Sequence, residues 1–374
     1  ITPQTCVEKG LPEHAFADAI ERELARTGTI GVGYNSIRFD DEVTRHLFWR
    51  NLIDPYAREW QNECSRWDLL DVMRCLYALR PEGIVWPCHD DGRPSFKLEH
   101  LTAANGIEHL AAHDALSDVR ATIALARRAK AANPRLWEFC LALRRKDAVW
   151  KEIGAARPVL HISGRYPVER GCIAIVWPLG LHPTNKNELI VWDLAHDPRE
   201  LEELDATAIR ARLFARQSDL PDGESRLPIK TIHVNKSPIV ISNLRTLGDA
   251  RAAHWGIDKA QCERHAQWAR ALRAPSPELW ADVYARPAPE QAPDVDEDLY
   301  GGFIGNADRR TLQRLRSLSP DQLAAKRTAF EDARLDELLF RYRARNFPQT
   351  LDDSERERWA RHCSERLHHG AGGA

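Results

Sequence analysis

The sequence predicts an α/β domain followed by a β-rich domain and then a helical domain, and three observations carry this prediction. Over the first 150 residues, segments with apolar residues at helical spacing alternate with a short strand. After Pro158, short β-rich runs separated by tight turns replace that pattern. A proline-rich, acidic stretch at 287–298 then leads into an arginine-rich helical segment. We therefore expect domains at 1–150, 155–285 and 286–374, within the two or three that 374 residues predict.

In the first domain, a strand over 29–35 ends in a loop, and the following helix begins at about Asp41. In the long alanine-rich helix we expect Leu116, Val119, Ile123 and Ala126 to face inward. This alanine-rich helix covers 115–132, and the other expected helices cover 16–24, 67–79 and 98–104. This alternation of strand and helices favours a sheet with helices on its faces.

The second domain is expected to consist mainly of strands, and the third mainly of helices. Short strands with tight turns favour a small barrel or sandwich. Its strands are expected at 159–163, 172–177, 188–194 and 229–234, with a helix near 209–217. The third domain is expected to be helical over 307–347 and 351–367.

Composition narrows the classes of function. The net charge of −2 and the pI of about 6.8 exclude a uniformly basic surface, although a basic groove on a neutral body remains compatible. No apolar run approaches the ~20 residues of a membrane span. The eight cysteines are scattered without a C-x-x-C pair, which disfavours a zinc knot and a secreted disulfide framework. We expect a cytoplasmic protein without membrane association, and a monomer.

Three side chains suggest chemistry by their context. Asp40 follows a strand and a loop at a helix start, where α/β sites form. His113 precedes the long helix and Asp118 lies in its first turns, so both could reach one metal-bound water. This arrangement suits metal-assisted hydrolysis, in which a carboxylate holds a divalent ion and the histidine takes a proton. Taken singly, these signals are weak. Helix capping for Asp40, a surface loop position for His113 and a solvated helix face for Asp118 are the competing explanations, and for Asp40 capping alone is the stronger one.

Two segments resemble motifs of the DEDD exonuclease superfamily in its histidine-containing variety. The sequence from Gly33 to Glu42 is similar to the second motif, and that from His113 to Asp118 is similar to the third. Ile1-Thr2-Pro3 resembles a loop that lies between that family's first strands and this region. Other segments are similar, in order along nearly the whole chain, to the bacterial exonuclease I family: 65–71, 77–83, 94–101, 182–187, 233–236 and 342–348.

The resemblance implies a 3′→5′ exonuclease that degrades single-stranded DNA to 5′-mononucleotides with Mg²⁺, in DNA repair and recombination. It implies a ribonuclease-H-like exonuclease domain, an SH3-like β-domain and a helical domain. By motif match, Asp40 and Asp118 are metal-binding acids and His113 is the general base. Two alternatives stay open: a module that binds single-stranded DNA without catalysis, and an RNA-processing exonuclease of the same fold.

The family's first motif, Asp-x-Glu on its first strand, has no counterpart in this sequence. The resemblance places that motif upstream of Ile1, so we expect an exonuclease domain that is incomplete at its N-terminus. Two ions must clamp the attacking and leaving oxygens in such sites. We therefore expect this chain by itself to be inactive or nearly so, and the intact gene product to be the enzyme.

Binding of single-stranded DNA requires cationic side chains that neutralise phosphates and aromatic side chains on which bases stack. Between Arg120 and Lys151 there are nine Lys or Arg residues against two acids. Packing, turn formation and ordinary surface charge are the competing explanations for each candidate. With the resemblance, the residues expected to contact DNA are Arg45, Tyr56, Trp60, Arg74, Lys97, Lys146, Asn187, Lys230, Asn235, Tyr300 and Phe303. The resemblance also implies binding of the acidic tail of single-stranded-DNA-binding protein, with Arg80 and Arg273 as candidate contacts.

Overall fold

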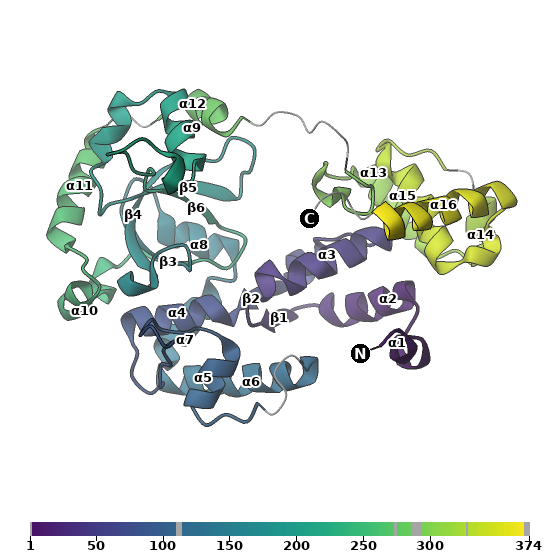
Figure 1. Cartoon of the computed structure of the whole chain (residues 1–374), viewed down its shortest axis with the longest axis horizontal. Coiled ribbons are helices and arrows are strands. Elements are labelled where there is room, and N and C mark those ends of the chain that lie inside the picture. Colours follow the sequence, from purple (N-terminus) through teal and green to yellow (C-terminus); the bar gives the residue numbers. More distant parts are fainter. Residues whose placement is uncertain (1, 110–113, 273–274, 286–292, 327, 370–374) are drawn as a thin grey trace. The chain divides into compact units, whose positions relative to one another are not determined.

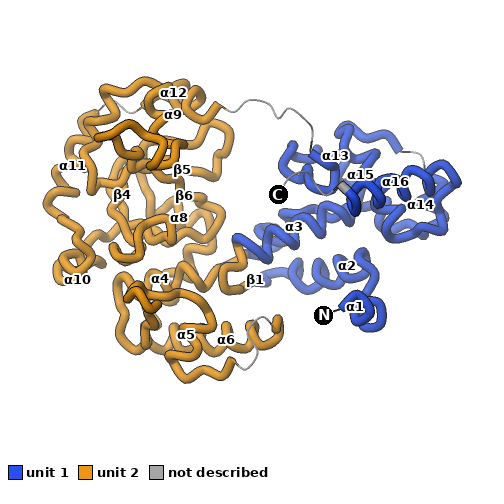
Figure 2. The backbone as a smooth tube through the Cα atoms, viewed as in Figure 1, with its two compact units in different colours: residues 1–31, 38–65, 288–374 blue, residues 32–37, 66–287 orange. Residues whose placement is uncertain are grey.

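The computed structural model describes residues 2–109, 114–272, 275–285, 293–326 and 328–369. They divide into two compact units (Figure 2). Unit 1 comprises residues 1–31, 38–65 and 288–374, and unit 2 comprises residues 32–37 and 66–287. Each unit is described by itself below, with the element labels of Figure 1.

Unit 1 is helical, and it joins segments from both ends of the sequence. Its core includes Trp49 and Leu52 at the end of α3, packed with Leu312 and Leu335 from the C-terminal helices. This packing explains why the arginine-rich C-terminal helices are stable, since their apolar stripe is covered. The helices are α1 (Pro3–Lys9), α2 (Glu13–Leu24), α3 (Asp40–Arg50), α13 (Asn306–Arg316), α14 (Pro320–Ala325), α15 (Arg334–Asn346) and α16 (Asp353–His369).

Unit 2 begins with the α-helical part of the expected exonuclease domain. Strand β1 (Ile30–Gly33) pairs with β2 (Ser65–Asp68), and the chain passes between the units within this ribbon. The helices that follow are α4 (Leu69–Leu79), α5 (Leu98–Ala104), α6 (Ala115–Ala132), α7 (Pro134–Ala142) and α8 (Lys146–Ile153). Helix α4 is the centre of this layer, because it contacts both α6 and α7.

The second part of unit 2 is a five-stranded antiparallel sheet in the order β6-β5-β4-β3-β7 (Figure 1). Its strands are β3 (Val159–Ile162), β4 (Ile173–Leu181), β5 (Glu188–Asp193), β6 (Ile229–His233) and β7 (Ile239–Ile241). The central strands are buried on both faces, as their near-continuous apolar sequence requires. Its helices are α9 (Ala206–Phe214), α10 (Asp249–His254), α11 (Lys259–Ala271) and α12 (Pro277–Tyr284).

The sheet contains a buried histidine that should make this unit sensitive to acid. His161 on β3 is 4% exposed, and its Nδ1 lies 2.9 Å from the hydroxyl oxygen of Tyr166. The pKa of His161 is lowered to about 3, chiefly by desolvation and in part by the nearby charge of Arg165, while Asp193 opposes the shift. The unfolded chain would take up this proton at about pH 6.5. The folded state therefore loses stability as the pH falls below about 6.5 towards 3, by about 1.4 kcal/mol per pH unit.

We expect His161→Gln to flatten this dependence of the unfolding free energy on pH. The measurement is urea unfolding at several pH values between 7 and 4, followed by fluorescence. His254→Gln is the control, because His254 is exposed at the end of α10. An acid dependence as steep in His161→Gln as in the parent would contradict the assignment.

Most of the expected elements are confirmed, and several details are wrong. The stretch expected to be helical over 307–347 is divided into α13, α14 and α15. Helices 98–104 and 115–132 and the four expected strands are present. The helix expected at 67 begins at Leu69, because Trp67 belongs to β2. In α6 the buried residues are Ala121, Leu125 and Ala129. Of the four residues expected to face inward, Leu116, Val119 and Ile123 are exposed and Ala126 is only half-buried. None of the helices in the described ranges is long and apolar enough to cross a membrane.

Candidate active site

Asp118 lies in the first turn of α6, and the sequence before the helix fixes its position. Asp114 is the N-cap, and its carboxylate accepts a hydrogen bond from the Ser117 amide at 3.0 Å. The side chain of Asp118 is 39% exposed, and its Oδ1 lies 2.7 Å from Nε2 of His109. Asp118 is therefore a carboxylate that is held on one oxygen while it remains accessible to solvent. His113 lies outside the described residues.

Asp40 is the first residue of α3 in unit 1. The residue in the N-cap position is Phe39, which makes no side-chain cap, so simple capping does not account for the Asp40 carboxylate. Desolvation raises the pKa of Asp40, and the negative charge of Asp41 adds to this. A backbone hydrogen bond and the positive charge of Arg58 oppose the shift. Asp41 itself is buried and paired with Arg58 at 2.6 Å.

The loop before Asp40 is anchored by a half-buried carboxylate in unit 2. Asp68 accepts hydrogen bonds from the backbone amides of Asn35 at 2.8 Å and Ile37 at 3.2 Å. It also caps α4 by accepting from the Leu70 amide. Desolvation raises the pKa of Asp68, and the three amide hydrogen bonds oppose the shift. Asn35 has a positive φ of 61°, a conformation that asparagine tolerates well.

The two predicted metal-binding acids belong to different units, Asp40 to unit 1 and Asp118 to unit 2. Across the described ranges, no group of three or more His, Cys, Asp or Glu side chains could hold a metal ion. The residues present are nevertheless oxygen donors, which suit a hard divalent cation. Mg²⁺ commonly takes one or two carboxylates together with substrate phosphates and water.

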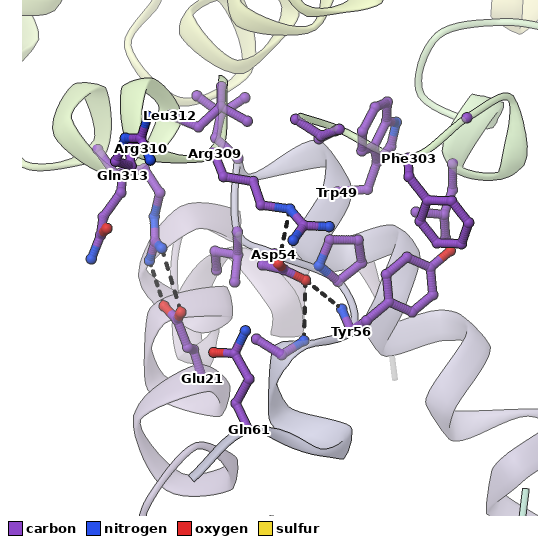
Figure 3. A pocket seen from close by; sticks show the side chains of 18 residues that line it. Glu21, Trp49, Asp54, Tyr56, Gln61, Phe303, Arg309, Arg310, Leu312 and Gln313 are labelled. Carbon is purple, nitrogen blue, oxygen red and sulfur yellow. Dashed lines mark hydrogen bonds and ion pairs between the residues drawn. The ribbon is translucent and has the colours of Figure 1, made fainter. Parts of the chain in front are cut away.

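Unit 1 contains a cavity of about 270 Å³ beside two of the predicted DNA-binding aromatic residues (Figure 3). The rings of Tyr56 and Phe303 lie 6.1 Å apart at one end of it. Phe303 is 85% exposed, which is unusual for a ring that serves only to fill a core. Asp54 holds the Tyr56 turn by accepting from the Tyr56 and Ala57 amides, and it pairs with Arg309 at 3.5 Å.

Arg45 lies under the ring of Tyr56, with its guanidinium carbon 5.2 Å from the ring centroid. It is 4% exposed and forms ion pairs with Glu59 at 2.7 Å and Glu42 at 2.6 Å. The hydroxyl of Tyr300 joins the same network through both Arg45 and Glu42. The sequence did not indicate that this arginine would be buried, because its carboxylate partners are identified only by the fold. A direct phosphate contact by Arg45 stays a prediction.

The other unit 1 candidates are surface aromatic residues. Trp60 is 64% exposed, and Tyr300 is 59% exposed despite its hydrogen bonds. Desolvation raises the pKa of Tyr56 to about 12, with the neighbouring Tyr300 as the next contribution, so the phenol is neutral at physiological pH. These rings together offer faces on which nucleobases could stack.

In unit 2 the predicted DNA contacts are spread over both of its parts. Lys146, at the start of α8, donates to the Asn187 amide oxygen at 2.5 Å, so these two candidates lie together. Lys97 is exposed at the N-cap of α5, whereas Arg74 pairs with Asp71 at 2.6 Å. The remaining two candidates are on or near β6. Lys230 has a pKa lowered by desolvation and by nearby arginines, and Asn235 is exposed.

Of the two arginines predicted to contact the partner protein, only one lies in the part of the chain that the structure describes. Arg80 follows α4 and donates to the carbonyl oxygens of Leu79 and Thr246. It is partly exposed, so its guanidinium remains available to an acidic ligand. Arg273 lies outside the described residues.

Two residues that contact the second and third motifs were not predicted from the sequence as part of the site. Asp68 lies in the segment 65–71 that carries the family resemblance, and it has no predicted role of its own. An aspartate directly before an apolar helical pattern is nevertheless a recognisable N-cap. His109, which contacts Asp118, carries no local signal of its own. Its position just upstream of the third motif was the only available hint.

Three family models match the chain in succession. The model described as Exonuclease matches residues 1–126, the Exonuclease I SH3-like domain matches 144–286, and the Exonuclease I C-terminal domain matches 293–374. These matches confirm the three kinds of domain that the resemblance implied. The precise boundaries between domains stay a prediction.

The chain is similar to exodeoxyribonuclease I of Escherichia coli, with 45% identity over 97% of this chain and 76% of that protein. It is also similar to exodeoxyribonuclease I of Haemophilus influenzae, with 44% identity over 99% of this chain and 79% of that protein. Exonuclease I from Methylocaldum szegediense has a similar structure, with a TM-score of 0.92 and 47% identity, covering 100% of this chain and 79% of that one.

Solved complexes of the E. coli exonuclease I are also similar. The complex with a dA16 oligonucleotide has a TM-score of 0.91 and 44% identity, and it covers 98% of this chain and 78% of that one. The zinc-ion-bound form of its single-stranded-DNA complex has a TM-score of 0.89 and 43% identity, covering 98% and 77%. A structure described as SSB/Exonuclease I in complex with an inhibitor has a TM-score of 0.85 and 42% identity, covering 97% and 76%.

Proposed function

Because the chain belongs to the exonuclease I family, we propose that it hydrolyses single-stranded DNA from the 3′ end and releases 5′-mononucleotides. The observation that carries the proposal is the 45% identity to an exodeoxyribonuclease over 97% of the chain. The dA16 complex of the E. coli relative supports single-stranded DNA as the substrate. This activity would serve DNA repair and recombination in the cytoplasm, and we propose that the protein acts as a monomer.

The proposed roles of the site residues follow the motifs. Asp118 and Asp40 would hold a divalent cation, and His113 would accept a proton from the attacking water at its imidazole. The accessible Asp118 carboxylate, held on one oxygen by His109, supports this assignment. The zinc-bound relative supports dependence on a divalent metal, and the oxygen donors favour Mg²⁺. Such an ion polarises the phosphoryl oxygen and lowers the pKa of bound water.

The proposed DNA contacts divide into stacking and phosphate-binding groups. Tyr56, Trp60, Tyr300 and Phe303 would stack on bases. The exposed rings of Trp60, Tyr300 and Phe303 support this role, and the half-buried ring of Tyr56 lies 6.1 Å from that of Phe303. Lys97, Lys146 and Lys230 would neutralise phosphates, which makes the affinity depend on salt. The groups proposed to orient the strand beside them are Arg45, Arg74, Asn187 and Asn235.

The experiment that tests the function is incubation of the purified chain with a 3′-end-labelled oligonucleotide and Mg²⁺. Stepwise release of labelled 5′-mononucleotide from single-stranded DNA, and not from duplex DNA, would support the proposed activity and would contradict the expectation that this chain by itself is inactive. Binding of the oligonucleotide without release of nucleotides would support the alternative of a binding module. The names of the relatives do not favour that alternative. Faster degradation of an RNA oligonucleotide would favour the RNA-processing alternative.

We also propose that an acidic C-terminal tail of single-stranded-DNA-binding protein docks at Arg80, with Arg273 as a second contact. The solved structure described as SSB/Exonuclease I supports this partner. The test is fluorescence anisotropy of a labelled acidic tail peptide, which should bind the parent chain and bind Arg80→Ala at least several-fold more weakly. Equal affinity for both would contradict the role of Arg80.

A further inference from the structure

The ring of His109 lies in unit 2 between α5 and α6, in contact with a side chain from each. Its Nε2 is 2.7 Å from Oδ1 of Asp118, in the first turn of α6. The side chain of His109 is only 6% exposed, whereas that of Asp118 is 39% exposed. A buried ring therefore contacts the proposed metal ligand from the protein side and leaves the rest of the carboxylate facing solvent.

The other ring nitrogen of His109 is fixed by α5. Its Nδ1 lies 3.2 Å from Oγ1 of Thr102, a residue that is fully buried. The Thr102 oxygen is in turn 2.9 Å and 3.0 Å from the carbonyl oxygens of Leu98 and Glu99, one turn earlier in the same helix. With Nε2–H donating to the Asp118 carboxylate, Nδ1 of the neutral ring is an acceptor, and the Thr102 hydroxyl donates its one proton to it. The imidazole is thus held on both sides, so its Nε2–H has a defined direction.

A carboxylate in the first turn of a helix can rotate about its side-chain torsions, which spreads a metal ligand over several positions. A buried hydrogen-bond donor on one oxygen removes that freedom. Groups of this kind behind metal ligands typically affect metal affinity or activity by about 10–100-fold when they are removed. The observed contact has the geometry that such a role requires, because the donor is buried and the acceptor is accessible.

We propose that His109 is a positioning residue for Asp118: its Nε2–H donates to Oδ1 and orients the carboxylate so that Oδ2 is presented to the divalent cation. This inference rests on the proposed function, which makes Asp118 a metal ligand. His109 does not touch the substrate in this role. Its effect reaches the reaction through the orientation of Asp118, and Thr102 fixes the ring from behind.

Two substitutions of similar size separate this role from packing. In His109→Gln, the side-chain amide can place an N–H near the position of Nε2 and keep the bond to Asp118. In His109→Asn, the shorter amide can reach Thr102 but not Asp118. The matched control is His100→Asn, because His100 lies on α5 and its Nδ1 contacts the hydroxyl of Ser95 at 2.8 Å instead of a carboxylate.

The primary measurement is binding of Mn²⁺ to the DNA-free protein, followed by the electron paramagnetic resonance signal of the free ion. We expect the dissociation constant of His109→Asn to rise about tenfold or more, and those of His109→Gln and His100→Asn to stay within about threefold of the parent. Thermal melting of each variant reports folding separately. In the nuclease assay, the Mg²⁺ concentration for half-maximal rate should rise in His109→Asn, with KM for DNA unchanged.

Equal Mn²⁺ affinity of His109→Asn and His109→Gln would overturn the proposal, even if both lose thermal stability. Asp118→Asn distinguishes this failure from failure of the proposed function. If Asp118→Asn weakens Mn²⁺ binding and His109→Asn does not, only the positioning role is wrong. If Asp118→Asn leaves Mn²⁺ binding unchanged, Asp118 is not a metal ligand, and both assignments fail.

Discussion

Asp118→Asn should reduce nucleotide release by about 1,000-fold or more while leaving the affinity for single-stranded DNA in EDTA nearly unchanged. Loss of an anionic ligand removes several kcal/mol of transition-state stabilisation, and each 1.4 kcal/mol corresponds to about tenfold in rate. Asparagine keeps the size of the side chain and an oxygen that can accept from His109, so the local fold should persist. The measurement is single-turnover release of 5′-mononucleotide from single-stranded DNA in Mg²⁺.

The matched control is Asp114→Asn, four residues earlier in the chain. Asp114 is a carboxylate at the N-cap of the same helix, and asparagine caps a helix about as well as aspartate does. We therefore expect Asp114→Asn to release nucleotides at a rate within a few-fold of the parent. A rate for Asp118→Asn within tenfold of the parent would exclude Asp118 as an essential metal ligand.

The double variant Tyr56→Ala and Phe303→Ala should weaken binding of single-stranded oligo-dT by about 30-fold or more. Each stacked base contributes about 1–3 kcal/mol, and two rings are removed beside the cavity in unit 1. Arg45 should stay in place without the Tyr56 ring, because Glu59 and Glu42 hold it independently. The measurement is fluorescence anisotropy at several salt concentrations, together with the length of DNA degraded per binding event.

The salt series separates stacking from phosphate contacts. Loss of the two rings should shift the affinity at every salt concentration and leave the slope of log K against log salt unchanged, since no cation is removed. Phe214→Ala is the control, because Phe214 on α9 is 52% exposed and also lies beside an arginine, Arg210. An affinity of the double variant equal to that of the parent would mean that these rings pack the surface without touching DNA.

The local elements were predictable because their signals are local. Asp114 caps the start of α6, and Asn133 and Pro134 mark its end. The sequence therefore places both ends of this helix correctly. The short strands of the five-stranded sheet were predictable for the same reason, because turns bound each apolar run. The third motif likewise identifies Asp118 from its neighbours in the chain alone.

Side-chain environments were not predictable in the same way. Helix α6 has two stripes that could be buried, one of Leu116, Val119 and Ile123 and another of Ala121, Leu125 and Ala129. Hydrophobicity favours the first stripe, but the small alanines of the second allow close packing against the neighbouring helices. Which stripe is covered depends on what packs against it, and periodicity within one helix carries no such information.

The sequence by itself determined the order of the domains, helices such as α6, the strands of the five-stranded sheet other than β7, and the identity of the acids in the two motifs, since each depends on residues a few positions apart. Only the tertiary structure decided that Arg45 is buried by two carboxylates, that Asp68 holds the loop before Asp40, and that His109 contacts Asp118. The physical reason is that hydrogen bonds and ion pairs act over about 3–4 Å in space, whatever the separation of the partners along the chain.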